Sequence, residues 1–178
     1  MNLTPRTRPS PAAATEVAPS QLPTLIARST ERLTGWLADH SIAILRVSLG
    51  MVFLMFGVLK FVPGASPAEE LAVRTVQTLS FGVLSAQAAL LVTAVVETFI
   101  AVTLITGRLL RTGLTVMAGA MVGIMSPLVI FATDLFPGAP TLEAQYVLKD
   151  IVLVASGLVI AATAMGARLQ TTPASHGR

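Results

Sequence analysis

The chain contains no cysteine among its 178 residues. This absence excludes disulfide bonds, thiol chemistry and cysteine-ligated iron–sulfur clusters. Its two histidines, His40 and His176, lie outside the apolar runs, which disfavours a histidine-ligated haem, although seven methionines leave methionine ligation open. The sequence also has no clustered metal ligands, no glycine-rich phosphate loop and no nucleophile elbow. It therefore indicates no metal site and identifies no catalytic residue.

Charged residues are scarce as well. They make up 12% of the chain, whereas 53% is hydrophobic and the mean hydropathy is +0.77. This composition is typical of an integral membrane protein, and the length allows one all-α domain of about four spans. The net charge of +3 would suit a nucleic-acid partner, but the basic residues flank the apolar runs. We therefore attribute them to membrane topology and expect the lipid bilayer, not nucleic acid, as the partner.

The alternation of polar and apolar stretches divides the chain into four parts. Residues 1–24 are rich in Pro, Ala, Ser and Thr and lack the apolar run of a signal peptide, so we expect a disordered tail. Residues 25–40 fit an amphipathic helix at the membrane surface, with a flexible linker as the alternative. Residues 41–165 form the predicted four-helix transmembrane domain, and residues 166–178 form a second disordered tail.

Four apolar runs are long enough to cross a bilayer. We expect spans at about 41–62, 85–106, 112–132 and 146–165. Between the first two, the sequence from Ser66 has the features of a helix start, which predicts a short amphipathic helix over 66–80 across one mouth of the bundle. Arginines concentrate in both tails and the second loop, so the positive-inside rule places both termini in the cytoplasm.

The first span carries two cations on one helical face. Arg46, Gly50, Phe53, Gly57 and Lys60 follow i, i+4, i+7, i+11, i+14 spacing. Because a charge inside a membrane helix is costly, this face should point into the bundle and meet anionic groups.

Later spans supply candidate partners for these cations. Glu97 lies near the middle of the second span, and Lys149 and Asp150 lie near the start of the fourth. At about 1.5 Å per residue, we expect Arg46 to meet Glu97 and Lys60 to meet Asp150. Lys149 and Asp150 point about 100° apart, so one of them should face another helix or the lipid head groups.

These five charged residues form the predicted buried polar cluster. Buried ion pairs can serve only to fix helix register, and that interpretation stays open. A lone carboxylate near the membrane midplane, such as Glu97, also fits a proton or ligand site.

The third span has no charge but contains two small residues four apart, Gly119 and Gly123. This spacing predicts close helix contact, as do Gly50 and Gly57 in the first span. Pro127 cannot donate to the carbonyl of Gly123, so we expect a kink with a spare acceptor there.

Several motifs together resemble the DoxX-like family of bacterial membrane proteins. The most specific are Arg46-Val-Ser-Leu-Gly50-Met-Val-Phe53-Leu, Phe56-Gly57-Val-Leu-Lys60-Phe61, Pro63-Gly64 and Ser66-Pro67-Ala68-Glu69. Supporting matches are Glu97, Thr106-Gly107-Arg108 and Gln145-Tyr146-Val-Leu-Lys149-Asp150. The resemblance covers about residues 41–165, with Ala144 where the family has glycine.

The resemblance implies a four-helix bundle in the bacterial cytoplasmic membrane. The family's namesake belongs to a membrane thiosulfate:quinone oxidoreductase, and relatives are associated with redox or stress functions. This implies a membrane subunit of a quinone-linked redox or stress-response system with membrane redox proteins as partners. Without cysteine or buried histidine, electron transfer here requires a quinone or a partner's cofactor. A small proton-coupled transporter using Glu97 and a non-catalytic scaffold are the alternatives, and homo-oligomerisation stays open.

Overall fold

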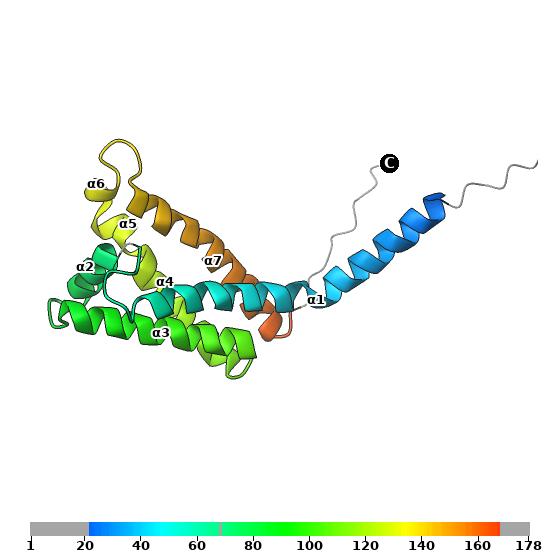
Figure 1. Ribbon diagram of the computed structural model, residues 1–178, viewed down its shortest axis with the longest axis horizontal. Coiled ribbons are helices and arrows are strands. Elements are labelled where there is room, and N and C mark those ends of the chain that lie inside the picture. Colours follow the sequence, from blue (N-terminus) through cyan, green and yellow to red (C-terminus); the bar gives the residue numbers. More distant parts are fainter. Residues whose placement is uncertain (1–21, 68, 168–178) are drawn as a thin grey trace, which may run out of the picture. The chain divides into compact units, whose positions relative to one another are not determined.

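The computed structural model describes residues 22–67 and 69–167, and every regular element in this part of the chain is a helix (Figure 1). Four stretches are long and apolar enough to cross a membrane, which confirms the predicted four-span helical class. The helices are α1 (Leu22–Leu59), α2 (Glu69–Leu79), α3 (Ala86–Thr106), α4 (Leu110–Met125), α5 (Pro127–Ile130), α6 (Ala132–Leu135) and α7 (Leu142–Ala164).

The chain divides into two compact units between Asp39 and His40. The helix expected at 25–40 and the first span are joined in α1, because no proline lies between residues 25 and 59 and each isolated glycine there costs a helix only about 1 kcal/mol. The described side chains of the first unit, residues 28–39, are all exposed. The site lies wholly in the second unit.

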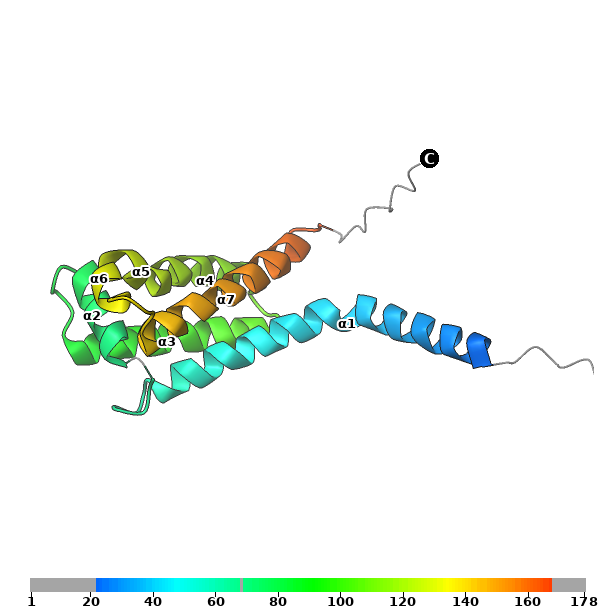
Figure 2. The same ribbon diagram turned by 90° about the horizontal axis from the view of Figure 1, so that it is seen from above.

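The second unit is a bundle of α3, α4, α7 and the part of α1 from His40 onward (Figure 2). All four helices contribute to one apolar core, in which Leu49 of α1, Leu104 of α3, Met117 of α4 and Ile160 of α7 are buried. Lipid tails are as apolar as these side chains, so close packing stabilises such a core more than the hydrophobic effect does.

A second, smaller core closes one end of the bundle, which we call the α2 end. Leu71 of α2 packs with Phe131, Leu135, Ala144 and Val147, and Figure 1 shows α2 beside α5 and α6. The helix predicted over 66–80 is therefore present, although it begins only at Glu69. The Glu69 carboxylate accepts a hydrogen bond from the Gly64 N–H at 2.8 Å and so ties the preceding turn to the helix start.

The third span is interrupted next to Pro127, where the sequence predicts a kink with a spare acceptor. α4 ends at Met125 and α5 begins at Pro127, with Ser126 between them. The freed carbonyl of Gly123 does not stay unsatisfied: it accepts the Ser126 hydroxyl at 2.7 Å and the Ser126 N–H at 3.2 Å. The serine next to the proline thus donates to the carbonyl that the proline leaves without a backbone donor. Backbone polar groups within a membrane need such internal partners.

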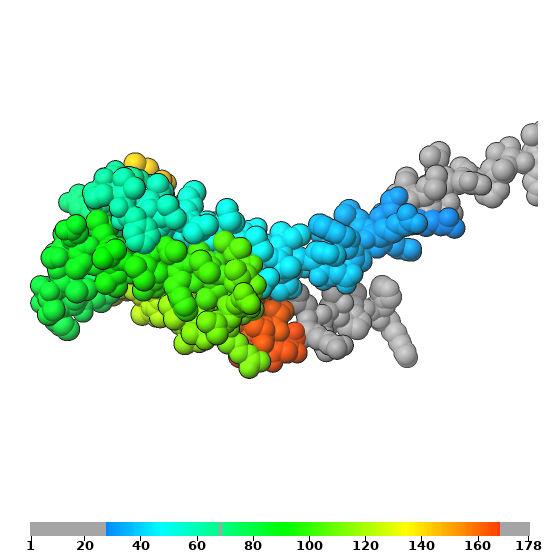
Figure 3. Space-filling view, turned by 60° about the horizontal axis from the view of Figure 1, so that its bottom comes forward, coloured from blue at the N-terminus to red at the C-terminus, as the bar shows by residue number. Residues whose placement is uncertain are grey.

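Two glycines let α1 lie directly against α3, and the space-filling view shows the second half of α1 on that helix (Figure 3). A Cβ atom added at Gly50 would lie 2.8 Å from Cγ1 of Ile105. One added at Gly57 would lie 3.1 Å from the Cβ of Glu97. Any larger residue at these positions would push the two helices apart.

The glycine pair of the third span behaves differently. Within the described residues, nothing lies within 4 Å of a Cβ added at Gly119 or Gly123, so the prediction that they bring helices of this chain into close contact is wrong. α4 instead buries the stripe Gly113, Met117 and Met121. Gly119 comes two residues after Met117 and therefore points about 200° away from that stripe.

Candidate functional site

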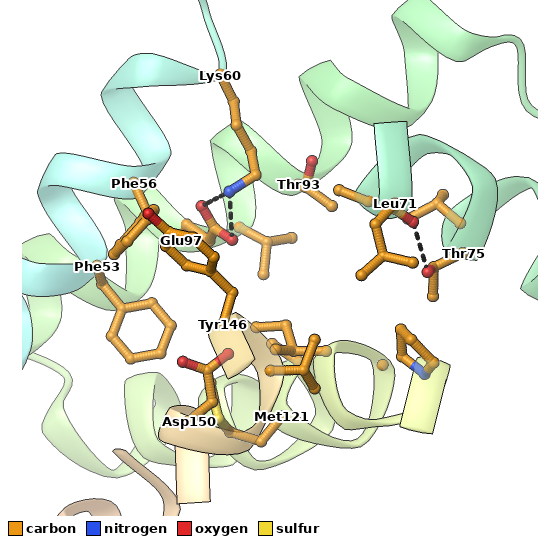
Figure 4. Close-up of a pocket in the computed structure, with 18 of the residues that line it drawn as sticks. Phe53, Phe56, Lys60, Leu71, Thr75, Thr93, Glu97, Met121, Tyr146 and Asp150 are labelled. Carbon is orange, nitrogen blue, oxygen red and sulfur yellow. Dashed lines mark hydrogen bonds and ion pairs between the residues drawn. The ribbon is translucent and has the colours of Figure 1, made fainter. Parts of the chain in front are cut away.

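A buried ion pair joins the end of α1 to the middle of α3. The Lys60 ammonium donates to both carboxylate oxygens of Glu97, at 2.9 and 2.7 Å (Figure 4). Each side chain is only 9% exposed. In such surroundings the two charges neutralise each other, and removing either one would leave a buried charge without its partner.

This pairing corrects the prediction from the sequence, which assigned Glu97 to Arg46. The Arg46 guanidinium instead lies against Gly107, which is ten residues, or about 15 Å, beyond Glu97 along α3. The reason is that α1 and α3 are shifted relative to each other along their axes. The first half of α3 runs beside α2, so α1 covers only the second half and its end reaches the level of Glu97.

Asp150 was expected to pair with Lys60, and this prediction is also wrong. Among the described residues no ion pair within 4.0 Å joins them, because Lys60 is already engaged by Glu97. Asp150 nevertheless projects from α7 into the same cavity as the ion pair (Figure 4).

Lys149 also lines the cavity and faces another helix, as expected for one of these two neighbouring residues. Its ammonium lies 3.9 Å from the centre of the Tyr146 ring and 5.0 Å from that of Phe56. Phe56 belongs to α1, so Lys149 bridges α7 and α1 by cation–π contacts. The same phenyl ring lies 5.8 Å from the Lys60 ammonium.

These groups surround a cavity of about 260 Å³ at the α2 end of the bundle (Figure 4). Its walls come from α1, α2, α3, α4 and α7 and are mainly apolar, with Phe53, Phe56, Leu71, Val96, Met121 and Ile124 among the lining residues. The hydroxyls of Thr75 and Thr93 also reach the cavity but donate to backbone carbonyls of their own helices. The charged lining groups are therefore Lys60, Glu97, Lys149 and Asp150.

Sequence reasoning found these four charged residues but missed most of the walls. It assigned no role to Tyr146 or Phe56 beyond the family motifs, although Phe56 belongs to the most specific of them. The contributions of α2 and of Met121 depend on how helices distant in sequence are packed, and no local pattern signals that.

An exposed interaction holds α2, one wall of the cavity, against α6. Arg74 forms a 2.8 Å ion pair with Asp134, and both side chains are about half exposed. The Arg74 guanidinium also lies 4.0 Å from the centre of the Phe131 ring. This contact lies outside the cavity, which makes it a suitable control for the buried pair.

Four apolar helices around a cavity with a buried Lys–Glu pair define a multi-pass integral membrane protein. A comparison with protein families matches residues 41–133 to DoxX, and the chain belongs to the DoxX family. The matched region includes Lys60 and Glu97 and stops before Asp150. No curated protein and no solved structure was found to match.

Proposed function

We propose that this protein is a membrane subunit of a quinone-linked redox or stress-response system, and that the cavity beside Lys60 and Glu97 receives a quinone head group. The observation that carries this proposal is the combination of apolar, aromatic walls with a buried charged pair at one cavity of the bundle. Small-molecule sites generally combine such walls with a few well-placed polar groups.

The residues of the cavity suit a quinone. A quinone ring is flat and apolar and accepts hydrogen bonds at its carbonyl oxygens, so it needs aromatic neighbours and donors. Phe53, Phe56 and Tyr146 supply rings, and the ammonium groups of Lys60 and Lys149 supply donors. Such a group takes up two electrons and two protons when it is reduced.

In this proposal the chain's own residues bind the quinone head group and exchange protons with it. Lys60 and Glu97 hold each other in place, and Asp150 adds a second carboxylate at the same cavity. Carboxylates and lysines within spans are the usual components of proton pathways. In this proposal the electrons come from the cofactor of a partner protein, since the chain has no cysteine to hold an iron–sulfur cluster of its own.

The test is quinone binding by the full chain purified in a mild detergent. Quinones that co-purify are identified by mass spectrometry, and a short-chain ubiquinone or menaquinone analogue is titrated into the protein. The double variant Lys60→Met/Glu97→Leu removes both charges without leaving one unpaired, so it should stay folded but bind quinone at least tenfold more weakly. The variant Arg74→Gln is the control. Binding by the double variant as tight as that of the unmodified chain would overturn the proposal.

A proton-coupled transporter is the second candidate, favoured by the two carboxylates, Glu97 and Asp150, that line one cavity. This alternative predicts pH-dependent solute movement in proteoliposomes that is lost in Glu97→Gln. A purely structural scaffold predicts instead that Glu97→Gln leaves cellular activity intact, whereas Arg46→Ala lowers abundance.

We also propose that the protein lies in the bacterial cytoplasmic membrane with both termini in the cytoplasm. The lack of cysteine makes this easy to test, because single cysteines can be introduced without background. Val83 lies in the exposed turn before α3 and Arg108 in the turn after it. In intact cells an impermeant maleimide should label Val83→Cys and not Arg108→Cys, and the reverse pattern would show the opposite orientation.

A further inference from the structure

Arg46 is a charge inside α1 that has no carboxylate within 4.0 Å among the described residues. The side chain is half-buried, and within the described residues it makes no hydrogen bond and no ion pair. A Cβ atom added at Gly107 would overlap its guanidinium, so the glycine provides the space in which this group lies. A guanidinium is always charged and carries five N–H donors, and leaving them unsatisfied near the hydrocarbon region is costly.

The end of the bundle around Arg46, which we call the turn end, is rich in positive charge. Arg108 and Arg111 lie in and just after the turn that joins α3 to α4. Arg111 donates to the carbonyl of Ala164 at the end of α7, but the distance is 3.4 Å and most of its donors stay available. Figure 3 shows the end of α7 next to this turn.

Carboxylates of the second unit lie elsewhere in its described part. They belong to α2, the middle of α3, α6 and the first half of α7, namely Glu69, Glu70, Glu97, Asp134, Glu143 and Asp150. The excess positive charge of the turn end therefore favours an anion from outside the bundle.

We propose that the turn end binds the phosphate of an anionic phospholipid, with Arg46 and Arg108 as its principal ligands. Guanidinium groups bind phosphate through paired hydrogen bonds, and basic pockets between membrane helices commonly hold anionic head groups. Arg46 can reach the head-group level because long cationic side chains extend along apolar surface toward the interface.

The surroundings favour a lipid over free phosphate. Apolar side chains next to the arginines are turned outward: Val47 follows Arg46 and is 37% exposed, and Leu109 follows Arg108 and is 69% exposed. An amphiphile with a phosphate and acyl chains satisfies both kinds of surface at once, whereas an inorganic anion satisfies only the charge.

The test measures lipid binding by the full chain in an uncharged detergent. Bound phosphatidylglycerol is quantified by native mass spectrometry, with phosphatidylcholine as a zwitterionic comparison and inorganic phosphate as a competitor. At about 1 kcal/mol for each basic residue near a membrane surface, Arg46→Gln should weaken phosphatidylglycerol binding about fivefold. The variant Arg74→Gln, which removes a cation from the α2 end, should leave binding unchanged.

Three results would overturn the proposal: phosphatidylglycerol binding by Arg46→Gln that equals that of the unmodified chain, an equal loss in Arg74→Gln, or full displacement of the lipid by inorganic phosphate. Should Arg46→Gln fail to fold, the exposed Arg108→Gln provides the same measurement. Retained binding in that variant would count equally against the site.

Discussion

Lys60 and Arg46 occupy the same face of α1, and the protein neutralises only one of them. At the α2 end, Lys60 meets Glu97 through two hydrogen bonds in a nearly closed environment. At the turn end, the Arg46 guanidinium lies beside Gly107 without a carboxylate within 4.0 Å in the described chain. A repeated pattern of charge and glycine along one helix can therefore lead to two outcomes: an internal pair at a cavity, and a cation that lies beside a turn with no carboxylate next to it in the described chain.

The largest loss of stability should come from breaking the Lys60–Glu97 pair. Glu97→Leu leaves the Lys60 ammonium buried without its partner, so we expect a loss of about 3–5 kcal/mol in the free energy of unfolding. Unfolding in mixed detergent–dodecyl sulfate micelles, followed by circular dichroism, measures this change.

The double variant Lys60→Met/Glu97→Leu is the matched control, because it removes both charges together. It should recover most of the lost stability. An equally unstable double variant would mean that packing around Glu97, and not the unpaired lysine, causes the effect.

A smaller loss of stability should follow from pushing α1 and α3 apart next to Glu97. Gly57→Val puts a side chain where a Cβ alone would lie 3.0–3.1 Å from atoms of Glu97 and Thr98. We expect a cost of about 1–3 kcal/mol, the usual range for overpacking, together with weaker ligand binding in the cavity. The same unfolding assay measures the cost.

Gly119→Val makes the same chemical change at a position where, within the described chain, no atom lies within 4 Å of an added Cβ. Its stability should stay within about 0.5 kcal/mol of the unmodified chain. A loss at Gly119 as large as that at Gly57 would indicate a packing role that a single chain does not show.

The smallest effect should come from the exposed pair. Arg74→Gln removes the contact with Asp134, whose side chain is about half exposed like that of Arg74. Such pairs contribute only about 0–1 kcal/mol, and salt screens them. A thermal unfolding series at low and high ionic strength should therefore show a small difference from the unmodified chain that shrinks as salt is added. A large, salt-independent loss would assign the stability to the stacking of Arg74 on Phe131 instead.

Much of this protein could be predicted from local sequence. Hydropathy locates the four spans, because about 20 consecutive apolar residues are what a bilayer requires. The break after Met125 follows from Pro127, which lacks a backbone N–H. Spacing places Arg46 and Lys60 on one face with Gly50 and Gly57, since helical periodicity depends on sequence alone.

Only the tertiary structure decided which charges meet. Periodicity fixes the face of each helix but not the offset between helices along their axes, and it is this offset that brings Glu97 to Lys60 and not to Arg46. The same offset leaves room for the cavity, because α2 and α7 line a space beside the first half of α3 that α1 does not fill. Offsets of this kind are set by side-chain packing between segments distant in the chain, and no short stretch of sequence encodes them.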